Sequence, residues 1–218
     1  CWYTLCNKSI MKIINDDCLN IMQNYNNNYF ELAIVDPPYG KKPMRNADGF
    51  GSKRNFDINS DKWDIKPNKK YFDELFRVSK NQIIWGMNYF IDYLKPTNSI
   101  VVWDKKTGGN PFADCELAWT SHTSNIKKFE MLWLGSHAHR VENLIHPTQK
   151  PVALYRWLLE TYAEPTDKIL DTHLGSGSIA IACHYFGTEE FVGIEIDKEY
   201  YDMANKRIEE ETRQLKLL

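Results

Sequence analysis

Short apolar runs alternate with longer amphipathic stretches along most of the chain. The apolar runs are rich in β-branched residues and bounded by polar or turn-forming residues, which indicates strands. In the stretches between them apolar positions recur three or four residues apart, which indicates helices. We expect strands at residues 32–35, 82–85, 99–103, 116–121, 129–134, 168–170 and 191–196, and helices at residues 70–78, 151–163, 178–186 and 198–215. This alternation predicts an α/β fold with parallel crossover connections.

The length of the chain fits one folded domain. Its 218 residues, 43% of them hydrophobic, can bury one large core. No apolar run approaches the ~20 residues that cross a bilayer, and no leader-like segment opens the sequence. We therefore expect a single domain over residues 11–218, located in the cytoplasm, and we expect residues 1–10, which precede Met11, to be an extension or a cloning remnant.

Cysteines and histidines do not form a metal-binding pattern. The cysteines are odd in number and scattered, which predicts reduced thiols; they are Cys1, Cys6, Cys18, Cys115 and Cys183. His137, His139 and His146 lie close together in the sequence, but no fourth ligand accompanies them. We expect no metal site.

A carboxylate, two prolines and an aromatic ring follow the apolar run 32–35, in the order Asp36-Pro37-Pro38-Tyr39. Proline restricts the backbone, so the loop after this strand is expected to be rigid. Such a loop suits a flat, amino-substituted ring, because the carboxylate can accept a hydrogen bond from the amine while the tyrosine stacks on the ring. A proline-terminated strand with a solvated Asp36 and a packed Tyr39 is the alternative.

A second motif, Asp171-Thr172-His173-Leu174-Gly175-Ser176-Gly177, leads from the strand at 168–170 into the helix at 178–186. Its glycines let the backbone approach a ligand, and the start of the helix directs free N–H groups at it. Glu195 ends the next strand about 20 residues beyond the glycines, where an acid can accept both hydroxyls of a ribose. The spacing predicts a nucleoside-containing cofactor. No Lys-Ser or Lys-Thr follows the glycines, which excludes the phosphate loop of nucleoside triphosphatases.

Two further segments accompany these motifs. His146-Pro147-Thr148-Gln149-Lys150-Pro151 precedes the glycine motif, and Asp16-Asp17-Cys18-Leu19 lies near the start of the chain. Together with Asp36–Tyr39 and residues 171–177, they resemble, in order, the motifs of the amino-methylating DNA methyltransferases that use S-adenosylmethionine. The resemblance covers residues 11–205.

The order and details of the motifs narrow this resemblance. The catalytic motif precedes the cofactor motif, as in the circularly permuted (beta-class) members of the family, and residues 103–105 and 116–119 are similar to small phage-type adenine members. Two places depart from the family pattern. Thr172 and His173 stand where the family usually has Pro-Phe, and Asp16 replaces a glycine.

The resemblance implies a fold and a site. The fold would be a Rossmann-like mixed sheet of the class I methyltransferase type with a minimal recognition insertion, within residues 105–145. The catalytic residues would be Asp36, Pro37, Pro38 and Tyr39. The S-adenosylmethionine site would be formed by Asp17, Asp36, Thr148, Lys150, Asp171, Gly175, Ser176, Gly177 and Glu195. Asp171 would lie near the methionine amino group and Lys150 near its carboxylate, while a helix cap is the alternative for Thr148.

A basic segment follows Tyr39, although the net charge of −2 argues against binding nucleic acid through overall charge. We expect a mobile basic loop at residues 41–69 that holds the DNA backbone around a flipped base. A solvated surface loop is the alternative. The expected DNA-binding residues are Lys41, Lys42, Arg45, Lys53 and Arg54.

The resemblance implies site-specific transfer of a methyl group to the N6 amine of an adenine in double-stranded DNA, by a protein expected to be a homodimer. Cytosine-specific members more often carry Ser at the position of Asp36, so N4-cytosine is the nearest alternative. An RNA or protein-amide methyltransferase and an inactive DNA-binding homologue are the others. The motif order argues against the former, and the usable motifs argue against the latter.

Overall fold

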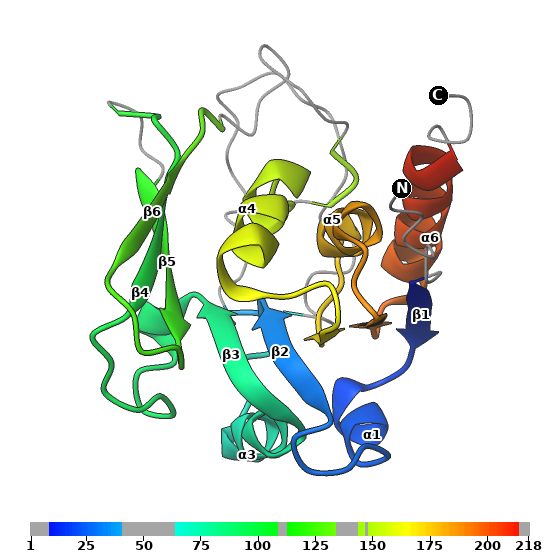
Figure 1. Ribbon diagram of the computed structural model, residues 1–218, viewed down its shortest axis with the longest axis horizontal. Helices are drawn as coiled ribbons and strands as arrows, with labels where there is room; N and C mark the ends of the chain where they lie inside the picture. Colours follow the sequence, from blue (N-terminus) through cyan, green and yellow to red (C-terminus); the bar gives the residue numbers. More distant parts are fainter. Residues whose placement is uncertain (1–8, 41–63, 109–112, 134–143, 147, 214–218) are drawn as a thin grey trace, which may run out of the picture.

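The fold is built on one mixed β-sheet. The computed structural model describes residues 9–40, 64–108, 113–133, 144–146 and 148–213. The strands in this part of the chain are β1 (Ile10–Asn15), β2 (Phe30–Val35), β3 (Ser79–Trp85), β4 (Ile100–Asp104), β5 (Cys115–Thr120), β6 (Lys127–Glu130), β7 (Lys168–Asp171) and β8 (Glu190–Glu195). They lie in the order β1-β8-β7-β2-β3-β5-β4-β6. Neighbours from β1 to β3 are parallel, whereas β5 is antiparallel to both β3 and β4 (Figure 1).

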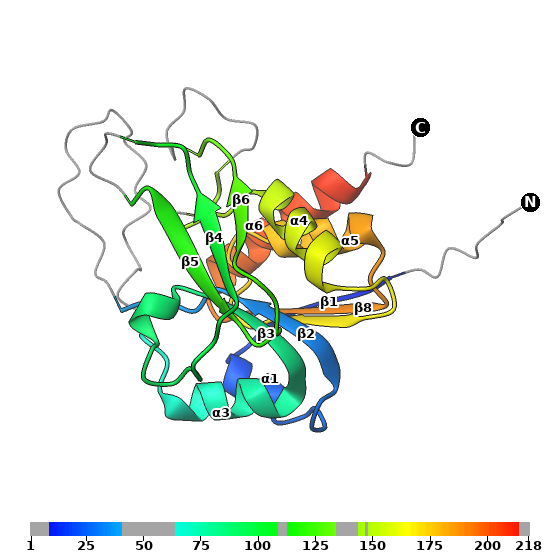
Figure 2. The same cartoon turned by 60° about the vertical axis from the view of Figure 1, so that its left-hand side comes forward.

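Helices cover both faces of this sheet. They are α1 (Cys18–Met22), α3 (Lys69–Val78), the short 3-10 helix η1 (Met87–Tyr89), α4 (Val152–Tyr162), α5 (Ser178–Phe186) and α6 (Lys198–Arg213). Figure 2 shows α4, α5 and α6 on one face of the sheet and α1 and α3 on the other. Within the described residues, no helix is both long and apolar enough to cross a membrane.

The central strands are buried on both faces, which explains their continuous apolar sequence. In β3, Ile83 packs into the core cluster beneath α4 and α5, while its neighbour Ile84 packs into the cluster beneath α3. In β2, Ile34 and Val35 divide in the same way. The α/β architecture and the mixed sheet predicted from the sequence are confirmed.

Two elements near the start of the chain were not predicted. Strand β1 begins at Ile10, in the segment expected to be an extension, and pairs in parallel with β8 from Ile10 opposite Glu190. Lys12 divides its apolar residues into two pairs, so it lacks the longer apolar run that marks the central strands. Helix α1 has five residues, too few to show a helical period.

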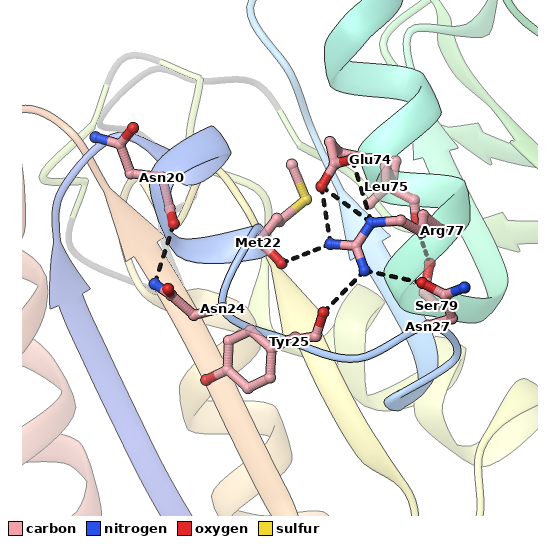
Figure 3. A network of polar contacts seen from close by, with 9 residues as sticks. All are labelled: Asn20, Met22, Asn24, Tyr25, Asn27, Glu74, Leu75, Arg77 and Ser79. Carbon is pink, nitrogen blue, oxygen red and sulfur yellow. Dashed lines mark hydrogen bonds and ion pairs between the residues drawn. The ribbon is translucent and has the colours of Figure 1, made fainter.

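Arg77, near the end of α3, fixes the connection between α1 and β2 (Figure 3). One guanidinium nitrogen donates to the carbonyl of Tyr25 at 2.8 Å and to Oδ1 of Asn27 at 3.0 Å. The other donates to the carbonyl of Met22 at 2.9 Å and pairs with Glu74 at 2.8 Å. Arg77 thereby satisfies carbonyls at and beyond the end of α1, where the helix cannot satisfy them itself.

Candidate active site

The predicted motifs meet at one edge of the sheet. The parallel strands β2, β7 and β8 end at Val35, Asp171 and Glu195, and Asp36 follows the first of them directly. Parallel strands present their carboxyl ends together, and that edge is where ligands bind in sheets of this kind. Motifs that are far apart in the sequence therefore face the same region.

Both carboxylate oxygens of Asp36 are engaged by side chains. The hydroxyl of Tyr39 donates to Oδ1 at 2.7 Å. The ammonium of Lys150 donates to Oδ2. The Asp36 side chain is 16% exposed, so the carboxylate is not completely closed off from solvent.

Tyr39 also packs against aromatic neighbours. Its ring stacks on the ring of Tyr89, with centroids 4.6 Å apart and planes 24° apart. Burial, followed by the charge of Asp36, raises the pKa of the Tyr39 hydroxyl, so this group remains a neutral donor. Beyond the loop, the N–H of Gly40 donates to Oδ1 of Asp64 at 3.0 Å, which ties down the exit of the motif.

Lys150 is buried between two acids, with a side chain only 3% exposed. Besides contacting Asp36, its Nζ lies 3.1 Å from Oε2 of Glu116 on β5. Burial alone would lower the pKa of Lys150, but the charges of Asp36 and Glu116 outweigh it and raise the pKa. Lys150 is therefore a cation held beside the carboxylate of Asp36. Its predicted role at the cofactor carboxylate stays a prediction.

Glu116 was not predicted as a site residue. Its Oε1 contacts Nζ of Lys105 at 2.5 Å. Burial would raise the pKa of Glu116, but Lys150 and Lys105 overcome this and lower it to about 2. The sequence contained only one signal for it, the similarity of residues 116–119 to phage-type methyltransferases.

Asp171 is a buried carboxylate, 2% exposed, at the end of β7. Its Oδ1 accepts the N–H of His173 at 3.0 Å. Burial raises its pKa to about 8, with the charges of Asp36 and Glu195 adding to the effect against the favourable N–H of His173. A cation placed beside Asp171 would remove this penalty.

Glu195 and the glycine turn are in direct contact. The N–H of Gly175 donates to Oε2 of Glu195 at 2.8 Å, and the N–H of Asp197 donates to Oε1 at 2.9 Å. Gly175 and Gly177 have φ of +54° and +74°, which suits glycine. The two parts of the predicted cofactor site thus form one unit.

Ser176 contacts the first residue of α5 through its hydroxyl and α6 through its carbonyl. Its hydroxyl lies 3.0 Å from the hydroxyl of Ser178, and it is buried. The buried Arg207 of α6 donates to the Ser176 carbonyl at 2.9 Å and to the Ser178 hydroxyl at 2.9 Å. These contacts stabilise the turn before α5, and Arg207 is a supporting residue that the sequence analysis missed. The cofactor role of Ser176 stays a prediction.

The segment before α4 is ordered by its own side chains. Oγ1 of Thr148 lies 3.1 Å from Nδ1 of His146. Thr148 is not a helix cap, because Pro151 is the N-cap of α4 and no side chain caps it. Burial, followed by the charge of Lys150, lowers the pKa of His146 to about 4, and its ring packs on Tyr200 with centroids 4.3 Å apart. His146 is therefore a neutral packing residue.

The two departures from the family pattern fit locally. Oγ1 of Thr172 lies 2.7 Å from the hydroxyl of Tyr71 and 2.9 Å from Nδ1 of His173, so polar contacts replace the apolar pair. Asp16 accepts the N–H of Asp17 at 2.6 Å without a positive φ. Asp17 in turn caps α1 by accepting the N–H of Leu19 at 2.8 Å.

Several predicted residues lie outside the described part of the chain. These are the basic residues Lys41, Lys42, Arg45, Lys53 and Arg54, together with His137 and His139. Among the residues that the structure does describe, no group of three His, Cys, Asp or Glu side chains could hold a metal ion.

The fold and the site define a Rossmann-like methyltransferase of class I. Comparison with protein families narrows this class, because residues 58–206 match the DNA methylase family N6_N4_Mtase. The match covers more than half of the chain, so the protein belongs to this family of DNA methyltransferases. The resemblance seen in the sequence is confirmed at that level.

Individual relatives agree with the family. Type II methyltransferase M.HpaI of Haemophilus parainfluenzae is 27% identical, over 92% of this chain and 74% of the relative. Type II methyltransferase M2.DpnII of Streptococcus pneumoniae is 24% identical, over 94% of this chain and 92% of the relative.

Solved structures share the fold. The complex of M1.HpyAVI with SAM has a TM-score of 0.61 and 20% identity, covering 91% of this chain and 99% of that one. The cytosine-N4-specific PvuII DNA methyltransferase has a TM-score of 0.62 and 11% identity, covering 95% and 92%. At these identities the likeness concerns the fold alone.

Proposed function

We propose that this protein transfers a methyl group from S-adenosylmethionine to the exocyclic N6 amine of an adenine flipped out of double-stranded DNA. One observation carries the proposal. Asp36, engaged by Tyr39 and Lys150, stands at the same sheet edge as Asp171 and Glu195. A hydrogen-bond acceptor for an amine and the expected cofactor groups thus share one edge of the sheet.

The described residues fit S-adenosylmethionine by the chemistry of their donors and acceptors. The buried Asp171, whose pKa is raised to about 8, suits the ammonium of the methionine end. Glu195 is oriented by two backbone N–H groups, and its oxygens keep lone pairs for the ribose hydroxyls. Asp17, at the N-cap of α1, stays a prediction for the adenosine end.

The chemistry requires orientation more than a strong base. The lone pair of an exocyclic amine is delocalised into its ring, and the amine is too weak an acid to be deprotonated first. Asp36 and the backbone carbonyl of Pro37 can accept hydrogen bonds from the two N–H groups of the amine. The nitrogen then becomes tetrahedral, and its lone pair points at the methyl group to be transferred. Bound S-adenosylmethionine supplies an activated methyl group. Alignment in a site with little water then carries most of the catalysis.

Tyr39 would bind the flipped base, and the basic loop would bind the DNA backbone around it. Stacking of Tyr39 on a flipped base is worth roughly 1–3 kcal/mol. Unstacking the target costs a few kcal/mol, and contacts between phosphates and the basic residues that follow Tyr39 in the sequence would offset this cost. Recognition within residues 105–145, the homodimer and a cytoplasmic location remain predictions.

Asp36 favours adenine as the base. The Asp-Pro-Pro-Tyr motif of this chain resembles the catalytic motif of the permuted, adenine-specific DNA methyltransferases. Cytosine-specific members of the family more often begin this motif with Ser. N4-cytosine is the second candidate, because its amine has the same geometry and a cytosine-N4-specific enzyme shares the fold.

A variant of Asp36 tests this function. Wild type, Asp36→Ala and the control Asp73→Ala, which changes an exposed carboxylate on α3, are incubated with unmethylated genomic DNA and labelled S-adenosylmethionine. We expect Asp36→Ala to lose transfer while still binding the cofactor, and Asp73→Ala to behave as wild type. Transfer by Asp36→Ala at the wild-type rate would contradict the mechanism.

A further inference from the structure

Four charged side chains of alternating sign run from the catalytic loop to the antiparallel half of the sheet. Asp36 contacts Lys150, Lys150 lies 3.1 Å from Glu116, and Glu116 lies 2.5 Å from Lys105. Their side chains are 16%, 3%, 26% and 18% exposed in that order. The two signs balance, which is what allows Lys150 to be buried as a cation.

The position of Glu116 differs from that of an ordinary ion-pair partner. It lies on β5, in register with Trp103 of β4, and it contacts the same Lys150 nitrogen that contacts Asp36. The Lys150 ammonium also lies over the Trp85 ring, 5.3 Å from its centroid. Two acids and one aromatic face therefore fix the place of a single nitrogen.

The fixed ammonium decides which oxygen of Asp36 serves the substrate. Lys150 engages Oδ2, whereas Oδ1 accepts from the hydroxyl of Tyr39. An ammonium has three donors, and a carboxylate oxygen has more than one lone pair. Because Lys150 also contacts Glu116, it binds Oδ2 of Asp36 alone. Oδ1 can then accept a hydrogen bond from an amine in addition to that from Tyr39.

We propose that Glu116 is a positioning residue for methyl transfer, which acts through Lys150 to keep Asp36 oriented toward the target amine. This rests on the proposed function. Without the charge of Glu116, the ammonium would have Asp36 as its remaining acid partner and could bridge both of its oxygens. The amine would then compete with Lys150 for Oδ1, although the fold and the cofactor pocket would be intact.

The test compares four variants with the wild-type protein in single-turnover methylation of unmethylated genomic DNA. They are Glu116→Gln, Lys150→Met, the double variant and the control Glu190→Gln. Glu190 is also a buried acid, 4% exposed and paired with Lys12 at 2.6 Å, but it lies at the opposite end of β8 from Glu195. Cofactor affinity is measured separately by calorimetry, and thermal unfolding is followed for every variant.

We expect Glu116→Gln to slow the transfer step by about 10- to 100-fold, while the dissociation constant of the cofactor changes by less than about threefold. The double variant should be no slower than Lys150→Met, because Glu116 acts through that lysine. Glu190→Gln should lose thermal stability without slowing transfer.

Three results would overturn the inference. The first is a wild-type transfer rate in Glu116→Gln. The second is a Glu116→Gln variant that loses cofactor affinity but not transfer rate. The third is a double variant whose transfer rate is reduced by the product of the two single-variant factors. Failure of the wild-type protein itself to methylate DNA would instead reject the proposed function, so the two failures are distinguishable.

Discussion

The hydroxyl of Tyr39 donates to Oδ1 of Asp36 at 2.7 Å, so the last and first residues of the Asp-Pro-Pro-Tyr loop are in direct contact. This contact occupies the oxygen that the target amine would need. A carboxylate oxygen can accept more than one hydrogen bond, so the amine can join Tyr39 or replace it. We therefore expect the ring of Tyr39, and not its hydroxyl, to contribute most to holding the base.

Replacing Tyr39 separates these two contributions. Tyr39→Phe keeps the ring that packs on Tyr89 and should transfer methyl groups at close to the wild-type rate. Tyr39→Ala loses a stacking contact worth roughly 1–3 kcal/mol and should raise the KM for DNA accordingly. Steady-state kinetics on DNA check both variants. Equal damage by Phe and Ala would assign the role to the hydroxyl.

Gly86 shapes the place that Tyr39 occupies. It has φ of +70°, and a Cβ there would lie 2.2 Å from Cε1 of the Tyr39 ring. Gly187, with φ of +80°, has open space around its missing Cβ and provides a matched control. Both Ala variants should lose about 1–2 kcal/mol of stability to backbone strain, but only Gly86→Ala should also lose methyl transfer. Equal activity in the two variants, measured below their unfolding temperatures, would show that methyl transfer does not depend on the position of the Tyr39 ring beside Gly86.

Asp171 makes the stability of the free protein depend on pH. Its pKa is 3.8 ordinarily and about 8 in the fold, so between these values the folded state binds more protons than the unfolded state. Stability contributed at this site therefore falls as pH rises through that window. Asp171→Asn should raise the unfolding midpoint at pH 8 by roughly 2–4 °C for each kcal/mol relieved.

The same variant should weaken cofactor binding, since an amide cannot balance an ammonium. Thermal scans at pH 5 and pH 8, with and without S-adenosylmethionine, measure both effects. A midpoint that changes equally at the two pH values would contradict the burial of an ionisable group at this position.

Arg77 should affect stability without affecting chemistry. It binds the carbonyls of Met22 and Tyr25 at the end of α1, away from the carboxyl ends of the strands. Arg77→Ala should cost about 1–3 kcal/mol in denaturant unfolding and leave transfer unchanged at low temperature. The control is Arg156→Ala, which removes an exposed residue of α4 paired with Glu160. This change should lower the free energy of unfolding by less than about 1 kcal/mol. A similar loss in both would show that the Arg77 network adds nothing specific.

The sequence revealed the parts of the fold and site that follow from local pattern. Strands such as β2 and β3 are apolar on both faces, so their runs stand out, and motifs after parallel strands must share an edge. Glu116 could not be found this way. Its contact with Lys150 joins residues 34 positions apart through an antiparallel strand, and no local pattern encodes that pairing. The edge strand β1 was missed because Lys12 interrupts its apolar residues after only two positions.

The base that receives the methyl group tests the central claim most directly. Unmethylated DNA is incubated with the protein and labelled S-adenosylmethionine, digested to nucleosides and separated by chromatography with mass detection. We predict that the label is in N6-methyladenine, and that Asp36→Ala leaves none. Label in N4-methylcytosine would contradict the assignment of adenine from Asp36, and label in RNA or protein alone would contradict the proposed substrate.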